Sequence, residues 1–199
     1  MSGKYMAYVG SYSYTGKAKG ITVFDVDVEN GMFKERCEIE VDNSSYVIAS
    51  SDGKTLYSIA DEGVVSFRIL PNGSLARLNS SSIRGMRGCH LCTDEEDKYV
   101  FVSGYHDGKT TVLNLNPDCS VGKFVDGVFD RGYGSVAERN FRPHVTCTRR
   151  MPDNRFVLSV DNGIDQVKIY RFNDKEQKLV QVDAIRCDLE SAPRHFRYS

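Results

Sequence analysis

One phrase of sequence recurs along the chain and constrains its fold more than any other feature. The phrase is a tight turn, an apolar strand, a polar loop and a second strand, and it begins in the ranges 51–60, 95–104 and 152–161. Asp52-Gly53 in the first copy and Asp153-Asn154 in the third supply residues that accept the positive φ of a tight turn. Repetition of one supersecondary unit predicts a repeat architecture.

The spacing of the copies indicates which architecture. Asp52 and Glu96 are 44 residues apart, and Glu96 and Asp153 are 57 apart, a difference that we assign to an insertion near 125–141. A period of about 45 residues with four short strands per unit is typical of a β-propeller blade. We therefore predict an all-β fold, with residues 1–199 forming a single partial β-propeller domain of about three and a half to four blades of four-stranded antiparallel sheets.

The final segment, 193–199, resembles the start of another repeat, so the ring is expected to be incomplete. Its two open ends would be covered by a second copy of the chain or by further blades. Formal net charge is −1 and no apolar run approaches a membrane span, which predicts no nucleic-acid and no membrane partner. The six cysteines are too sparse for a disulfide scaffold, and with no export signal at the N-terminus we expect them reduced in a cytoplasmic protein.

The strand before each turn carries a polar or aromatic residue near its start. Aligning the repeats places Tyr46, His90, His144 and Arg194 at one equivalent position. In a propeller the first strand of each blade lines the central channel. The alignment therefore predicts that these four side chains converge on one end of the channel.

Several motifs, in this order and spacing, resemble the seven-bladed propeller lactonases over essentially all of the chain. This family includes bacterial 6-phosphogluconolactonases of the propeller type and fungal carboxymuconate cycloisomerases. Its members are roughly twice as long, so the chain is similar to their N-terminal half. It departs from the family pattern in the loop after Ile59, which is shortened and has Asp61-Glu62 where an Asn-Glu pair is usual, and after His144, where the family tends to have a second His. The motifs that carry the resemblance are 10–13, 45–46 with 51–54, 89–91, 142–144, 156–165 and 192–196.

The resemblance implies a lactonase-like hydrolase that opens a sugar lactone or phospholactone such as 6-phosphogluconolactone. His144 or Glu138 would activate water, because imidazole and carboxylate groups act as general bases. Arg194, with Arg142, would stabilise the negative charge of the attacked carbonyl. The remaining residues expected to bind substrate are Tyr46, His90, Tyr105 and His195, and the small-molecule partner is a lactone or sugar phosphate.

No metal or cofactor is expected. Cys89 and Cys92 have the Cys-x-x-Cys spacing of a zinc site, but alternation along a strand would point the two sulfurs to opposite faces, and no second pair follows. Ring opening by activated water needs neither.

The sequence leaves other functions open. A non-catalytic binding or interaction propeller uses the same fold, and a carboxymuconate-type cycloisomerase uses similar groups to move a proton without water. Individual residues also have structural explanations: His144 as a strand histidine satisfied by a backbone carbonyl, Glu138 as a solvated loop carboxylate, and Arg194 as an exposed terminal cation.

Overall fold

The computed structural model of the chain describes residues 5–134 and 141–198, in which fifteen strands form four antiparallel sheets. In chain order the strands are β1 (Tyr5–Gly10), β2 (Gly20–Asp27), β3 (Met32–Glu40), β4 (Val47–Ala49), β5 (Thr55–Ala60), β6 (Gly63–Ile69), β7 (Leu75–Ser82), β8 (His90–Thr93), β9 (Tyr99–Gly104), β10 (Lys109–Leu115), β11 (Val121–Phe129), β12 (Val145–Arg150), β13 (Val157–Asp161), β14 (Gln166–Asn173) and β15 (Lys178–Arg186).

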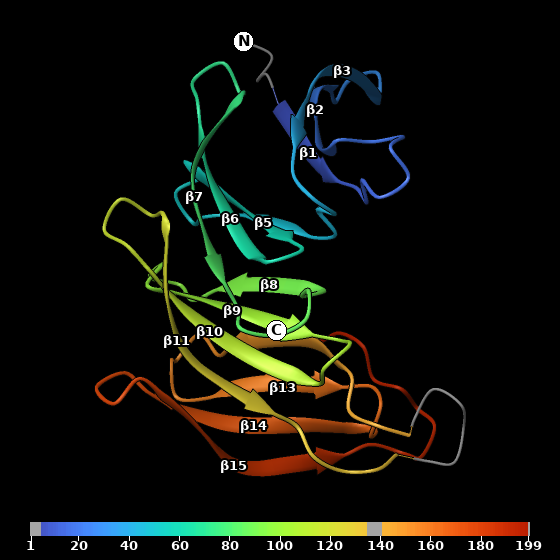
Figure 1. Ribbon diagram of the computed structural model, residues 1–199, viewed down its shortest axis with the longest axis vertical. Helices are drawn as coiled ribbons and strands as arrows, with labels where there is room; N and C mark the ends of the chain where they lie inside the picture. Colours follow the sequence, from blue (N-terminus) through green and yellow to red (C-terminus); the bar gives the residue numbers. More distant parts are fainter. Residues whose placement is uncertain (1–4, 135–140, 199) are drawn as a thin grey trace.

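Each sheet is a meander of consecutive strands. The first has the order β1-β2-β3, and the other three are four-stranded: β4 to β7, β8 to β11 and β12 to β15. Figure 1 shows the four sheets following one another along the molecule, from β1–β3 in blue at one end to β15 in red at the other. The repeat prediction is confirmed: each repeat is one propeller blade, and four blades are present.

The turns that define the repeat have the backbone conformation that the sequence predicts. Gly53, Asp97 and Asn154 have φ of 66°, 48° and 58°, in the left-handed region that tight turns require. Gly, Asn and Asp enter this region at the least cost. The repeated phrase is therefore a backbone requirement of each blade.

The strands inside the molecule are apolar on both faces, and the two faces pack against different neighbours. In β9, Val100 and Val102 join a cluster between the second and third sheets, whereas Tyr99 and Phe101 join one between the third and fourth. A third cluster, with Leu56 and Phe67, lies between the first and second sheets. The period of two residues along a strand thus builds a core on each side of every internal sheet.

The position of the insertion differs from the prediction. Residues 125–129 belong to β11, which pairs with β10 through Phe129. The extra length therefore begins at Asp130 and ends before β12. Two register shifts in the β10–β11 pairing break the alternation that identifies a strand in sequence, which is why the end of β11 resembles a loop.

The backbone register also corrects the alignment of the repeats. The amides of Ser50, Asp94 and Met151 each donate to the carbonyl five residues ahead, so these residues are equivalent. Counting back four residues from each gives Tyr46, His90 and Cys147. The structural equivalent in the fourth blade is thus Cys147, and His144 lies three residues earlier, ahead of a register shift between Val145 and Cys147.

No helix in the described parts of the chain is long and apolar enough to cross a membrane. Large apolar side chains are exposed on the outermost strands of the two terminal sheets, with Met32 and Phe33 on β3 and Val182 and Ile185 on β15.

Candidate functional site

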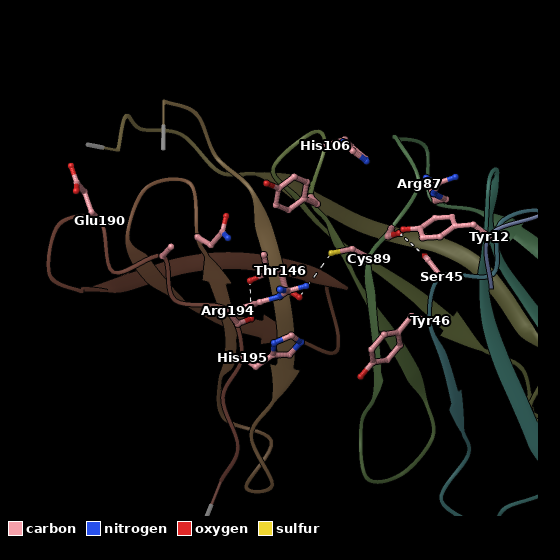
Figure 2. Close-up of a pocket in the computed structure, with 14 residues that line it drawn as sticks. Tyr12, Ser45, Tyr46, Arg87, Cys89, His106, Thr146, Glu190, Arg194 and His195 are labelled. Atoms are coloured by element: carbon pink, nitrogen blue, oxygen red, sulfur yellow. Dashed lines mark hydrogen bonds between the residues drawn. The ribbon is translucent and has the colours of Figure 1, made fainter. Parts of the chain in front are cut away.

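A cavity of about 860 Å³ lies where the loops that precede or follow the strands of all four sheets meet. Figure 2 shows Tyr12 and Arg87 on one side of it and Arg194 and His195 on the other. We call these sides the Arg87 wall and the Arg194 wall. The residues that line the cavity are Tyr12, Ser45, Tyr46, Arg87, Gly88, Cys89, Tyr105, His106, Thr146, Asn162, Glu190, Ala192, Arg194 and His195.

The Arg87 wall is held by contacts among three sheets. Arg87 lies between β7 and β8, and its Nη1 donates to Asp61 Oδ1 at 2.8 Å. Its guanidinium carbon lies 5.0 Å from the centre of the Tyr12 ring, which comes from the loop after β1. The cation is therefore fixed by a carboxylate on one side and an aromatic face on another.

Asn43 anchors the loop that carries Tyr12. Its side-chain oxygen accepts from the amides of Ser13 and Tyr14, both at 3.0 Å, and its side-chain nitrogen donates to Asp61 Oδ2 at 2.8 Å. Asn43 is buried and has a φ of 51°. One side chain thus ties the Tyr12 loop to the carboxylate that holds Arg87.

The Arg194 wall is held less firmly. The carbonyl of Arg194 accepts a 2.8 Å hydrogen bond from Thr146 Oγ1 on β12, and both Arg194 and His195 are exposed. Partial desolvation, and then the positive charges of Arg194, Arg149 and Arg197, lower the pKa of His195. His195 is therefore an uncharged imidazole at neutral pH.

Tyr105 lines the cavity and has His144 directly behind it. The two rings stack at 4.3 Å with an angle of 13°, and His144 Nδ1 lies 2.6 Å from the Tyr105 carbonyl oxygen. A carbonyl only accepts, so the proton is on Nδ1, and Nε2 is the basic nitrogen. The His144 amide donates to Asp161 Oδ1 at 2.8 Å, which fixes the start of the strand.

His90 is fully buried below the same cavity. Its ring packs on Tyr46 at 4.9 Å and faces His195 at 6.0 Å, and its Nε2 lies 3.7 Å from Cys147 Sγ. Burial, followed by the charges of Arg149, His195 and Arg197, lowers the pKa of His90 to about 3. His90 therefore acts as a neutral packing group beneath Tyr46.

Two buried carboxyl groups, Asp130 and Asp161, lie close to each other and to Tyr170 of β14. Asp130, where the long loop begins, accepts from the Tyr170 hydroxyl, and its Oδ2 has no hydrogen-bond partner in the described structure. Asp161 Oδ2 is likewise buried without one. Burial raises the pKa of Asp130, the Tyr170 hydroxyl opposes this, and Asp161 adds to it. Asp130 therefore keeps its proton to a higher pH than an ordinary aspartate.

The structure brings together most, but not all, of the residues that sequence predicts for the site. Tyr46, Tyr105, Arg194 and His195 line the cavity. His90 and His144 form a layer behind the lining, in contact with Tyr46 and Tyr105. Arg142 is exposed and packs on Phe141 with its guanidinium carbon 5.5 Å from the ring centre. Glu138 lies outside the described residues.

Sequence reasoning missed Arg87, Asp61 in its role as the partner of Arg87, and Asn43. Arg87 and Asn43 lie outside the repeated phrase, and Asp61 lies in its polar loop, whose residues differ from copy to copy. One signal was available: Arg87 precedes Cys89-His90 much as Arg142 precedes His144. A cation just ahead of an inner strand marks the same end of the channel in successive blades.

The cysteine pair is oriented differently from the expectation based on alternation. Cys89 Sγ lies 3.3 Å from the Val145 carbonyl oxygen, and Cys92 Sγ lies 3.8 Å from Arg149 Nη1, so both sulfurs face β12. Cys89 precedes β8, which explains why the strand alternation does not apply to it. In the described residues no group of three or more His, Cys, Asp or Glu side chains is arranged to hold a metal ion.

Comparisons with known proteins agree with this architecture. A family model described as Lactonase, 7-bladed beta-propeller, matches residues 6–199. A 6-phosphogluconolactonase of Bacillus subtilis is 31% identical over 201 residues, covering 98% of this chain and 56% of that protein. The crystal structure of a candidate 6-phosphogluconolactonase from Bacteroides fragilis, 29% identical, matches with a TM-score of 0.87 and covers 98% of this chain and 58% of its own.

The chain thus spans little more than half the length of the relatives it matches. A 6-phosphogluconolactonase of Formosa agariphila, 26% identical over 200 residues, gives the same proportion, with 95% of this chain and 57% of that protein aligned. Four blades out of seven correspond to this share.

Proposed function

The chain belongs to the lactonase family of seven-bladed β-propellers, and on that premise we propose that its pocket binds a sugar lactone and opens the ring by hydrolysis. The supporting observation is that Arg87 and Arg194 line the same pocket as Tyr105, whose ring stacks on the His144 imidazole. Water attack on a lactone needs a base for the proton of water and a cation for the charge that develops on the carbonyl oxygen. The names of the relatives favour a phosphorylated sugar lactone.

We assign the base to His144. Its Nδ1 proton is held by the Tyr105 carbonyl, which leaves Nε2 to accept a proton. The stacked Tyr105 ring and the Asp161 hydrogen bond to the His144 amide hold the imidazole in one orientation. Fixing the tautomer and the orientation of an imidazole in this way is what a general base requires. Glu138, outside the described residues, is the alternative base.

Arg194 is assigned to the carbonyl oxygen. Its guanidinium lines the pocket, and the Thr146 hydroxyl holds its backbone at 2.8 Å. Arg142, on the loop that ends at His144, is proposed as a second cation. Tyr46 and His195 then bound the space that the sugar ring occupies, with His90 supporting Tyr46 from behind.

The reaction balances without a cofactor. The oxygen of water bonds to the lactone carbonyl carbon, and its proton passes to His144 Nε2 while the carbonyl oxygen gains negative charge beside Arg194. The bond between that carbon and the ring oxygen then breaks. The ring oxygen takes the proton from the imidazolium and leaves as a hydroxyl, and the new carboxylic acid ionises, releasing one proton to solvent.

Acid release from 6-phosphoglucono-δ-lactone in a pH-stat tests the proposal. The chain should exceed spontaneous hydrolysis, and His144→Asn should reduce the excess by about 10²- to 10⁴-fold. Asparagine keeps a donor for the Tyr105 carbonyl but has no basic nitrogen. A wild-type rate equal to spontaneous hydrolysis would refute lactonase activity for the chain. An unchanged rate in His144→Asn would remove His144 as the base.

A further inference from the structure

We propose that Arg87 is the residue that selects a phosphorylated substrate, by binding the phosphate monoester of the sugar on the wall opposite Arg194. The inference rests on the proposed function and adds to it a residue and the chemical group that it recognises. The two ends of the substrate would then each meet one arginine, the carbonyl at Arg194 and the phosphate at Arg87.

The geometry of Arg87 leaves most of its hydrogen-bonding capacity for a ligand. A guanidinium has five N–H donors, and in the described structure the acceptor of Arg87 is a single oxygen, Asp61 Oδ1. The Tyr12 face and the Asp61 carboxylate fix its position before any ligand arrives. A planar, fixed fork of N–H groups matches the oxygens of a phosphate.

The charge of the pocket also favours an anion. Arg87 and Arg194 both line it, Glu190 is the one acidic side chain among its described lining residues, and Asp61, which pairs with Arg87, lies outside that lining. Figure 2 places Glu190 beyond Arg194, far from Arg87. A phosphate monoester carries close to two negative charges at neutral pH. The two arginines therefore attract it more strongly than they attract a neutral sugar.

The contacts of Arg87 also allow a purely structural explanation, in which it ties the loops of three sheets together. These two explanations predict different results. If Arg87 only ties the loops together, replacing it weakens the binding of every ligand equally and lowers the free energy of unfolding. An anion anchor discriminates between a phosphorylated ligand and a similar ligand without phosphate.

Calorimetric binding to the 199-residue chain separates the chemical groups. Glucose 6-phosphate carries the phosphate without a carboxylate, and gluconate carries the carboxylate without a phosphate. Arg87→Gln should weaken glucose 6-phosphate binding by about 10- to 100-fold and gluconate binding by less than about threefold. Arg84→Gln is the matched control, since Arg84 lies on the same loop, outside the pocket, over the Phe124 ring. It should change neither affinity.

Three outcomes would overturn the proposal: no binding of glucose 6-phosphate by the wild-type chain, equal weakening of both ligands in Arg87→Gln, or equal weakening of glucose 6-phosphate in Arg87→Gln and Arg84→Gln. Turnover provides an independent arm. The ratio of hydrolysis rates for 6-phosphoglucono-δ-lactone and glucono-δ-lactone should fall about 10-fold or more in Arg87→Gln. If neither lactone is hydrolysed but the binding results hold, the proposed function fails and the Arg87 assignment stands.

Discussion

Arg87 and Arg194 reach the same pocket from walls that are held in different ways. Asp61 and the Tyr12 ring both contact the Arg87 guanidinium, and the buried Asn43 links Asp61 to the Tyr12 loop. On the other wall, Thr146 holds the carbonyl of Arg194, in a segment that forms no strand in the described structure. One cation is fixed by its side chain, and the other is held by its backbone.

This difference indicates that Arg87 and Arg194 have different roles. A side chain that is already ordered loses little conformational entropy when a ligand binds, which suits recognition of a permanent charge such as a phosphate. A side chain that is free to move can follow the charge that develops on a carbonyl during reaction. The Arg87 wall is thus suited to selecting the substrate and the Arg194 wall to assisting the chemistry.

The largest expected effect is on the Arg194 wall. Arg194→Gln should reduce lactone hydrolysis by about 10²- to 10³-fold, because a donor facing the developing oxyanion is lost. The pH-stat assay measures this effect. Arg197→Gln removes the same charge from the same segment at a residue that does not line the pocket. Equal losses in the two variants would show that Arg194 acts only through its general positive charge.

The second effect tests how firmly the Arg87 wall is held. Asn43→Ala should lower the free energy of unfolding by about 3 kcal/mol, since the Ser13 and Tyr14 amides lose their acceptor and alanine tolerates the φ of 51° poorly. Urea denaturation measures the change. Asn43→Gly loses the same hydrogen bonds without the strain and should recover about 1 kcal/mol. A cost below about 0.5 kcal/mol in Asn43→Ala would refute the anchor role.

A third effect is the pH dependence of stability that Asp130 contributes, away from both walls. Burial raises the pKa of Asp130 in the folded chain, whereas an unfolded aspartate keeps its ordinary value. At a pH between the unfolded and the folded pKa of Asp130, folding therefore takes up a proton. The stabilisation that Asp130 gives to the folded chain is complete in acid and is lost as pH rises through the folded pKa. The contribution of Asp130 to the free energy of unfolding should therefore fall from acid to neutral pH, whereas the lowered pKa of His90 acts in the opposite direction.

Asp130→Asn removes the titrating group and keeps a partner for the Tyr170 hydroxyl. The free energy of unfolding of the wild type minus that of the variant should therefore fall as pH rises, by urea denaturation at matched pH values. The Arg87 wall does not contact this pair, so glucose 6-phosphate binding should not follow the same pH profile. A difference between the two free energies of unfolding that stays constant with pH would contradict the raised pKa of Asp130.

The sequence predicted the blades because their turns and strands obey local rules. Positive φ at Gly53, Asp97 and Asn154 is a property of single turns, and alternation along β9 is a property of a single strand. Both are therefore visible in residue order. The resemblance to the lactonase family added the order of motifs and with it the expected site.

The site was predicted less completely because it depends on contacts among blades. Tyr46, Tyr105, Arg194 and His195 line one cavity, yet the alignment placed His144 where the register places Cys147. The register shift in β12 leaves no mark in composition. The setting of Arg87 was missed because Tyr12 and Asp61 meet it from separate sheets, which no local spacing reveals.

The smallest effect tests the hold on the Arg194 backbone. Thr146→Val removes the hydroxyl that donates to the Arg194 carbonyl at 2.8 Å and nearly keeps the shape of the side chain. Loss of one such hydrogen bond costs about 1 kcal/mol, which should raise about fivefold the fraction of molecules in which the Arg194 segment is detached from β12. Tryptic cleavage after Arg194 should be faster by the same factor. Thr22→Val, on β2 in the first sheet, is the matched control and should leave this cleavage rate at the wild-type value. If Thr146→Val also leaves it unchanged, the Arg194 segment is held by more than the Thr146 hydroxyl, and the two walls are closer in rigidity than their contacts indicate.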